Sequence, residues 1–506
     1  NPSIIWLARY FEERRAGKSV YDATYDTHIS SWKAIMAAAL AGTFAYTALM
    51  ITEFRGFRDF GIISALGMFS CWLGTVFILP TFNAVYESIR PFPAKKNVTS
   101  SELNLYGLAF RHLVFRAPGV TVTIAGLLVV GGLVATGIAI AKDPIEYNFR
   151  KLSSQRETAS HTADLMRKIS EIVGQAGSGN GIAMWVPNLD EVLHIKRELE
   201  QNRDQHGAAY GAIRGIDNLL PKDQAQKIDL LRDIRRQLLE IRPFATPEQQ
   251  ARIDTNLPPE HIALVRAEEL PIEAVRLFTE RNGVRGRILI IEQQLKRSTW
   301  DGRYLVAWAH DLRKVHLKDG TSPPLAGRAP IFADIIEAIW VDGPKTIAAS
   351  FSFTVFLIFL AFRHRRERWL TLAALLVGVT WMAGVMTVLR IKLNFLNFVA
   401  FPITFGIGVD YGVNVMRRYV SERENGLSDL DAIRTAVEQS GGAVTLCSMT
   451  TVLGYMSLFT SANQALTSFA AAMTISEIAC LLAAVLALPA WLVWRAQRKT
   501  TVAWRF

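Results

Sequence analysis

The stretch GIGVDYG places a carboxylate and a phenol next to each other inside an apolar segment. Asp410 and Tyr411 lie in the run from Leu393 to Met416, which is long enough to cross a bilayer. A carboxylate near the middle of such a helix costs a few kcal/mol on insertion scales, so it needs a partner, a proton or a wet cavity. The tyrosine hydroxyl can hydrogen-bond a carboxylate in either protonation state. The two residues therefore predict a functional site within a membrane.

Three glycines surround the Asp410 and Tyr411 pair: Gly406, Gly408 and Gly412. Glycines on a membrane helix let a second helix approach closely. We therefore expect all three to be helix-packing residues, and we expect Asp410 to face another helix instead of lipid.

Other polar side chains lie in the neighbouring apolar runs. Thr450 and Thr451 are candidates for the proton path, although threonines in membrane helices also bond their own helix backbone. Glu477 is a second carboxylate within a span, with either a role in proton entry or binding or an incidental place at a wet cavity. The asparagines of the Asp410 segment are expected to hydrogen-bond neighbouring helices. They are Asn394, Asn397 and Asn414.

The composition indicates a membrane protein with a large extramembrane domain. Of the 506 residues 50% are hydrophobic, and they are concentrated in long runs on both sides of a charged central block. The net charge is +11, but the basic residues cluster at the ends of apolar runs, where membrane orientation explains them better than nucleic-acid binding. The cysteines Cys71, Cys447 and Cys480 all lie in apolar runs, so they predict neither a disulfide framework nor a zinc site.

The sequence shows no motif that would support catalysis. It has no nucleophile elbow, phosphate loop or metal-ligand spacing, and its histidines are scattered without a ligand pattern. A lipid-modifying enzyme would need a nucleophile or a metal set at the membrane face. We therefore expect no enzymatic activity, no cofactor, no metal and no nucleic-acid partner.

Eight apolar runs divide the chain into spans and connecting segments. The compact basic loop RHRRER, Arg363 to Arg368, marks the inner side, and with this loop inside every other basic cluster also falls inside. The charged central block then lies outside. The expected order is a cytoplasmic amphipathic segment (1–31), two spans (32–82), a cytoplasmic linker (83–116), one span (117–141), an extracytoplasmic domain (142–345), five spans (346–494) and a cytoplasmic tail (495–506).

Local patterns predict several elements of the parts outside the membrane. Alternating charges from Arg9 to Thr27 predict one solvated amphipathic helix. In the extracytoplasmic domain, Gly181 to Pro187 and Arg285 to Gln293 are strand-like. Apolar residues recur at helical spacing from Arg156 to Val173 and from Lys222 to Leu239. The domain is therefore expected to be α+β.

The two ends of the chain repeat each other. With an offset of 409 residues, roughly 80 ungapped positions match, among them Gly17 with Gly426 and Cys71 with Cys480. Both copies keep the same order of inner and outer segments. The pattern is a parallel internal repeat of the kind found in transporters.

The same offset of 409 residues aligns Asp410 with Asn1 and Tyr411 with Pro2. We therefore expect the chain to be the C-terminal part of a longer protein, with the first copy of the Asp410 helix ending at its first residues. The competing account is a half-transporter that forms a homodimer. Glu477 has Met68 as its counterpart, so the symmetric core does not require it.

Three segments carry a resemblance to a known family. GIGVDYG followed by RRY is similar to the central helix of the MMPL branch of the resistance-nodulation-division (RND) superfamily. SMTTVLGYMSL, Ser448 to Leu458, resembles the next helix of that branch, and LAGRAPIFADIIEAIW, Leu325 to Trp340, resembles the segment that leads back into the membrane. As a whole the chain is most similar to the hopanoid-biosynthesis-associated members.

The resemblance implies a polytopic α-helical membrane protein with about twelve spans in full, eight of them here, and periplasmic porter domains. It implies proton-driven export of hydrophobic lipids, such as hopanoids, from the bacterial inner membrane, with Asp410 and Tyr411 as the proton relay. The partners would be lipids, protons and the missing N-terminal half of the protein. An RND drug-efflux pump and a sterol-sensing-type receptor or scaffold are the alternatives.

Overall fold

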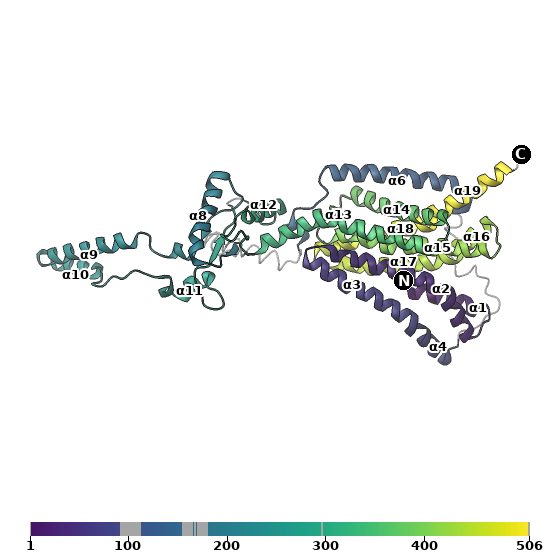
Figure 1. The fold of residues 1–506 in the computed structure, drawn as a ribbon, viewed down its shortest axis with the longest axis horizontal. Helices are drawn as coiled ribbons and strands as arrows, with labels where there is room; N and C mark the ends of the chain where they lie inside the picture. Colours follow the sequence, from purple (N-terminus) through teal and green to yellow (C-terminus); the bar gives the residue numbers. More distant parts are fainter. Residues whose placement is uncertain are drawn as a thin grey trace. The chain divides into compact units, whose positions relative to one another are not determined.

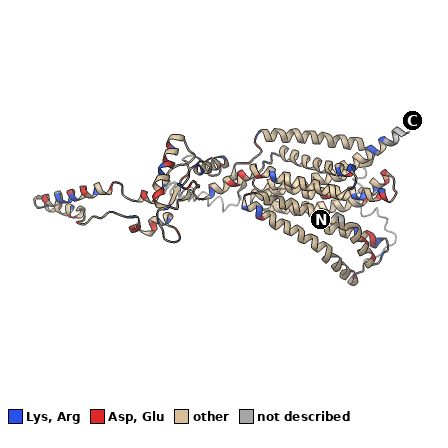
Figure 2. Cartoon of the chain, viewed as in Figure 1, with Lys and Arg blue, Asp and Glu red and all other residues tan. Residues whose placement is uncertain are grey.

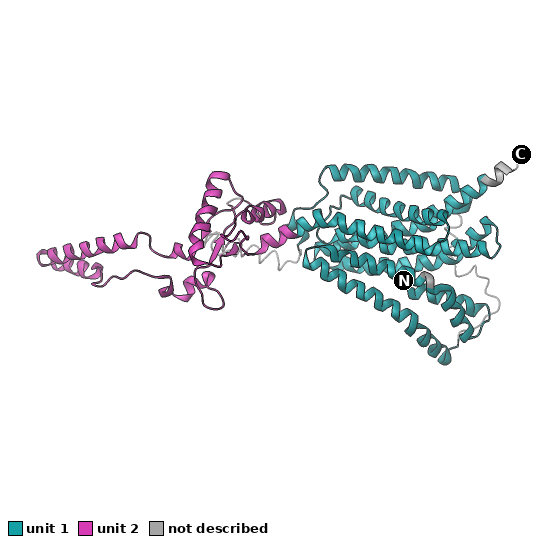
Figure 3. Ribbon diagram, in the orientation of Figure 1, with its two compact units in different colours: residues 1–159, 335–506 teal, residues 160–334 magenta. Residues whose placement is uncertain are grey.

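The computed structural model describes residues 2–91, 113–153, 165, 168, 181–294 and 297–503. The chain divides into two compact units, residues 1–159 with 335–506 and residues 160–334 (Figure 3). We name the first the membrane unit and the second the inserted unit. The inserted unit falls within the range expected for the extracytoplasmic domain. Except for two residues, the helix expected from Arg156 to Val173 lies outside the described residues.

The inserted unit contains a four-stranded antiparallel sheet in the order β2, β3, β1, β4. Its strands are β1 (Ile182–Trp185), β2 (Ile213–Arg214), β3 (Ile288–Ile291) and β4 (Leu325–Ala326). β1 and β3 confirm the two strands predicted from the sequence. Alternate residues of β3, Leu289 and Ile291, are buried, as expected for a strand with one face on a core.

Five helices accompany this sheet in the part of the inserted unit that the structure describes (Figure 1). They are α8 (Leu189–His206), α9 (Gln224–Ile241), α10 (Pro247–Asn256), α11 (Ile272–Val275) and α12 (Gly302–Arg313). α9 confirms the helix predicted from Lys222 to Leu239. α12 buries Trp308 and Leu312 completely, so its apolar face completes the core of the unit.

The membrane unit is built from long helices. They are α1 (Pro2–Arg15), α2 (Val20–Thr47), α3 (Arg55–Leu73), α4 (Leu79–Ile89), α6 (Pro118–Ala141), α13 (Arg328–Ala361, whose first residues belong to the inserted unit), α14 (Arg365–Val388), α15 (Ala400–Glu424), α16 (Asp429–Thr435), α17 (Gly441–Met456), α18 (Gln464–Leu482) and α19 (Leu488–Ala503). Charged side chains gather near the ends of these helices (Figure 2). α6 carries none.

The helices of the membrane unit are long and apolar enough to identify a membrane protein. Among the described residues, seven helical runs could cross a membrane by length and composition. The bent pair Val20–Trp32 and Ile35–Ile51 gives an eighth if its halves form one span. The sequence predicted eight spans.

The first helices differ from the sequence prediction. Instead of one solvated helix from Arg9 to Thr27, α1 ends before Gly17, whose φ of 89° is left-handed and favours glycine. α1 packs against α2 and buries Trp6 and Tyr10. The prediction of one helix is wrong because the chain turns at this glycine. The equivalent Gly426, after α15, has a φ of 91°.

The 409-residue offset recurs in other irregular features of the membrane unit. The equivalent turns are 3-10 turns at 48–51 and 457–460 and π-helical turns at 74–78 and 483–487. Edge-to-face ring pairs also correspond, since Tyr46 with Phe60 and Tyr455 with Phe469 each have centroids 6.1 Å apart. These features recur at the offset predicted from the sequence, whereas the π-helical turn at 436–440 corresponds to regular α-helix at 27–31.

α15 is the most enclosed membrane helix. In an apolar stretch of 18 residues within Asn397–Glu424, 89% of the residues are buried, whereas the share in such a stretch of Pro118–Ala141 is 6%. α15 packs most extensively against α2, and it also packs against α14 and α18. The helix that carries the GIGVDYG stretch is therefore surrounded by other helices.

The glycines of α15 differ in how closely a neighbour approaches. A Cβ atom at Gly406 would lie 2.3 Å from Cβ of Ala45 and 2.6 Å from the carbonyl oxygen of Ala41, both on α2. At Gly408 the nearest atom is Sγ of Cys480 on α18, at 2.6 Å. At Gly412 no atom would be closer than 3.5 Å, which is ordinary contact. The close helix approaches therefore require glycine at the first two positions.

We expect Gly406→Ala to destabilise the membrane unit and Gly412→Ala to leave it unchanged or slightly stabilised. At position 406 the added methyl overlaps α2, and overpacking of this kind costs about 1–3 kcal/mol. At position 412 there is room, and alanine favours a helix over glycine by about 1 kcal/mol. Thermal unfolding of the detergent-solubilised full-length protein measures the difference. Equal unfolding temperatures for the two variants would contradict the close approach of α2 to α15.

Candidate functional site

α15 holds Asp410 inside the membrane unit. The residue is 5% exposed. Nδ2 of Asn414 donates to Oδ1 of Asp410 at 2.5 Å and to the Asp410 backbone carbonyl at 2.9 Å. A spacing of four residues puts the two side chains on one face of the helix. Asn414 thus bonds Asp410 on its own helix, and not a neighbouring helix as the sequence predicted.

The next residue of α15 contacts a second carboxylate. The hydroxyl of Tyr411 donates to Oε2 of Glu477 on α18. The two residues are 1% and 2% exposed, so the hydrogen bond is fully buried. Glu477 was a candidate from the sequence without an assigned partner. The structure brings it together with Tyr411 in one site.

Asp410 is next in sequence to Tyr411, whose hydroxyl donates to Glu477, so the two buried carboxylates lie in one polar group. Among the described residues, no lysine or arginine forms an ion pair with either carboxylate. An ion without a partner in an apolar interior costs several kcal/mol, and two like charges repel each other in addition. Binding of one proton removes part of this cost.

A pair of tyrosines extends the polar group. Tyr46 on α2 and Tyr455 on α17 lie near Glu477. The two tyrosines correspond to each other at the 409-residue offset. The sequence comparison matched them but assigned them no function. Two polar side chains at corresponding positions within apolar runs were the sequence signal that could have identified them as candidate site residues.

Thr450 and Thr451 make backbone bonds. Both hydroxyls donate to the carbonyl oxygen of Cys447, at 2.8 and 3.0 Å. Of the two alternatives left open by the sequence, these contacts match bonding to the helix backbone. A place in the proton path stays a prediction for both residues.

Two asparagines fix the start of the Asp410 segment. Nδ2 of Asn394 and Nδ2 of Asn397 both donate to Oγ of Ser468 on α18, at 3.0 and 2.8 Å. These bonds connect different helices, as predicted for the two residues. They hold the beginning of α15 beside α18, the helix that supplies Glu477.

The described residues offer no evident metal site. No group of three or more histidine, cysteine, aspartate or glutamate side chains in this part of the chain could hold an ion. The cysteines Cys71, Cys447 and Cys480 are free thiols. Asp410 and Glu477 are the buried carboxylates of the site.

The family model described as the MMPL family matches residues 3–121 and 288–505. These two segments make up more than half of the chain and contain α15 with its site. The chain belongs to the MMPL family. The second segment includes both Asp410 and Glu477, so the site lies within the part of the chain that defines this MMPL protein.

Two curated relatives match parts of the chain. The membrane protein MJ1562 of Methanocaldococcus jannaschii is 31% identical over 137 residues, which are 27% of this chain and 35% of that protein. The hopanoid transporter HpnN of Rhodopseudomonas palustris is 29% identical over 150 residues, 28% of this chain and 17% of that protein. The chain thus matches well under half of the length of these relatives.

The fold is similar to that of a solved structure. SecDF, a translocon-associated membrane protein from Thermus thermophilus, aligns with a TM-score of 0.51 over 98% of this chain and 52% of that chain. The sequence identity is 13%, so the likeness concerns the fold alone.

We expect Tyr411→Phe to destabilise the membrane unit by about 1–3 kcal/mol, because Glu477 would lose its donor at a buried position. Glu477→Gln should be tolerated better, since an amide oxygen still accepts from the Tyr411 hydroxyl. Thermal unfolding of the full-length protein in detergent measures both effects. Tyr25→Phe is the control, because Tyr25 is exposed. If Tyr411→Phe unfolds at the same temperature as this control, the buried bond contributes nothing to stability.

Proposed function

We propose that the full-length protein is a proton-driven RND-type exporter that moves hydrophobic lipids, hopanoids first among them, from the bacterial inner membrane toward the periplasm or outer membrane. The observation that carries the proposal is the pair of buried carboxylates, Asp410 and Glu477, with no basic partner among the described residues. A helix bundle with only a structural role would be more stable with apolar residues at these positions.

Proton binding changes the charge of the site and its hydrogen bonds. Ionised Asp410 accepts from Asn414, whereas a protonated carboxyl group becomes a donor and no longer repels Glu477. α15 contacts α2 at Gly406, where there is no side chain to absorb a displacement. Closely packed helices pass such displacements on to their neighbours. Because α2 and α15 belong to different copies of the repeat, protonation of Asp410 would change how the two copies pack.

The direction of transport follows from the proposed orientation. The basic loop from Arg363 to Arg368 follows α13, and the inserted unit precedes it in the chain. With the basic loop on the inner side, one crossing by α13 puts the inserted unit on the outer side. A periplasmic inserted unit is a suitable place to receive a lipid that leaves the inner membrane.

The substrate class is supported by similarity. HpnN, with 29% identity over its matched segment, is a hopanoid transporter. The apolar helix surfaces of the membrane unit are in contact with the phase in which such lipids dissolve, so a lipid substrate can enter from the side.

We expect Asp410→Asn to abolish proton-driven lipid transport while the protein stays folded. Asparagine has nearly the shape of aspartate and still accepts a hydrogen bond, but it cannot bind and release a proton. The measurement is movement of a labelled hopanoid by the full-length protein in proteoliposomes with an imposed proton gradient. Release by the variant should fall to the level of empty liposomes.

Asp59→Asn is the matched control, because the side chain of Asp59 is 49% exposed and forms an ion pair with Arg55. This variant should transport like the wild type. Equal transport by Asp410→Asn and wild type would show that Asp410 is not the proton relay. Proton-driven movement of drugs but not of lipids by the wild type would instead favour a drug-efflux pump.

A further inference from the structure

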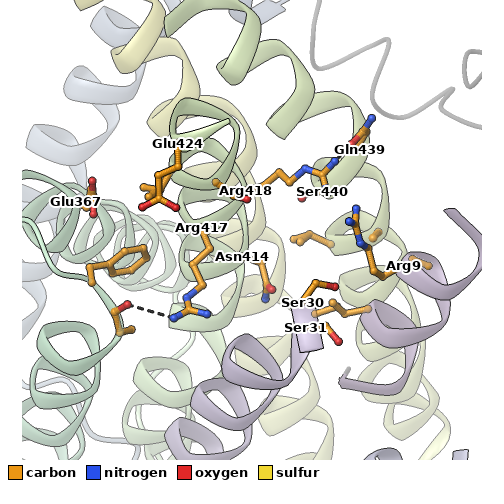
Figure 4. A pocket seen from close by; sticks show the side chains of 18 of the residues that line it. Arg9, Ser30, Ser31, Glu367, Asn414, Arg417, Arg418, Glu424, Gln439 and Ser440 are labelled. Atoms are coloured by element: carbon orange, nitrogen blue, oxygen red, sulfur yellow. Dashed lines mark hydrogen bonds between the residues drawn. The ribbon is translucent and has the colours of Figure 1, made fainter. Parts of the chain in front are cut away.

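A cavity of about 770 Å³ opens in the membrane unit (Figure 4). Its walls come from α1, α2, α15, the start of α17 and the loop between α13 and α14. Arg363 and His364 of the basic RHRRER loop line it, so the cavity lies at the end of the unit that the distribution of positive charge places inside. Polar residues form much of its wall.

One line of side chains on α15 leads from this cavity to Asp410. Asn414 and Arg417 line the cavity (Figure 4) and follow Asp410 by four and seven residues, which places all three on one face of the helix. Nδ2 of Asn414 donates to Oδ1 of Asp410 at 2.5 Å. Asn414 therefore touches both the cavity and the carboxylate.

We propose that the cavity is the water-filled inner end of the proton path and that Asn414 is the positioning residue that joins it to Asp410. The proposal rests on the proposed function, because it needs a proton that leaves Asp410 on the inner side. The cavity is many times larger than one water molecule, which takes up about 30 Å³, and its polar walls can hold water. Asn414 orients Asp410 toward this water.

The arginines of the cavity are engaged in ways that favour water over a bound anion. Arg418 lies 3.3 Å from Glu12 and 2.9 Å from Glu422. Arg9 lies 2.8 Å from Glu12 as well. Arg417 donates to the backbone carbonyl of Ala361 at 3.3 Å. Arg363 is the fourth arginine of the cavity, whose wall also holds Glu12, Glu367 and Glu424. Since two of the four arginines are paired with glutamates, the cavity does not present the concentrated positive charge that an anion would require.

Chemical accessibility tests the water-filled cavity independently of transport. The full-length protein is prepared in membrane vesicles with Cys71, Cys447 and Cys480 replaced by alanine. Ala443→Cys, on the cavity wall, should then react with a membrane-impermeant thiol reagent from the inner side only. Met449→Cys on the same helix is the control, because Met449 is 43% exposed at mid-helix, on the surface expected to face lipid. It should not react from either side.

Variants of Asn414 test its link to Asp410. Asn414→Leu removes the donor to the carboxylate, and proton-driven transport should fall about tenfold or more. Asn414→Gln keeps an amide and should retain more transport. A second readout does not depend on transport: Asp410→Cys should react slowly from the inner side while Asn414 is present, and faster when it is combined with Asn414→Ala.

Reaction of Ala443→Cys from the inner side alone, with loss of transport after modification, supports the proposal. No reaction, or reaction from the outer side, overturns the assignment of the cavity. Unchanged transport after complete modification overturns its place in the proton path, and unchanged transport by Asn414→Leu overturns the role of Asn414. The proposed function fails on a different result, normal transport by Asp410→Asn, whatever the labelling shows.

Discussion

The membrane unit depends on keeping two carboxylates, Asp410 and Glu477, inside an apolar helix bundle where no lysine or arginine of the described residues pairs with them. Glu477 has Tyr411 as its partner only because α15 lies close to α18, and Gly408 makes this approach possible by leaving room for Cys480. Gly406 does the same toward α2. Helices that face lipid could not supply these contacts, which explains why α15 is enclosed while α6 is not.

The repeat supplies a common backbone on which the two copies place different side chains. Tyr10 donates to Glu87 at 2.9 Å and Arg14 lies 2.8 Å from it, whereas the equivalent tyrosine and arginine of the second copy contact Asp429. The carboxylate comes from α4 in one copy and from α16 in the other. Glu477 likewise has a methionine as its counterpart. Positions that correspond at the 409-residue offset therefore carry different contacts.

The sequence predicted the helices and strands that follow from local residue patterns. It did not predict the contacts between segments that are distant in sequence. Apolar runs and alternating residues were enough for the membrane helices, β1 and β3. The partner of Tyr411 could not be predicted, because the rotation of α18 against α15 decides which side chains meet. The four-residue spacing of Asp410 and Asn414 could have predicted their hydrogen bond, because residues four apart on a helix are neighbours. The sequence analysis instead predicted that Asn414 bonds another helix. The cavity depends on five segments that are distant in sequence.

The neutral partners of the two carboxylates suit a site that changes its protonation state. A lysine beside Asp410 would form a buried ion pair, and breaking such a pair costs about 3–5 kcal/mol. The amide of Asn414 and the hydroxyl of Tyr411 can instead donate to an ionised carboxylate or accept from a protonated one. Neither state then leaves a buried polar group without a partner. The same fold can therefore hold Asp410 and Glu477 in both states, and the difference between the states appears as charge and not as a lost hydrogen bond.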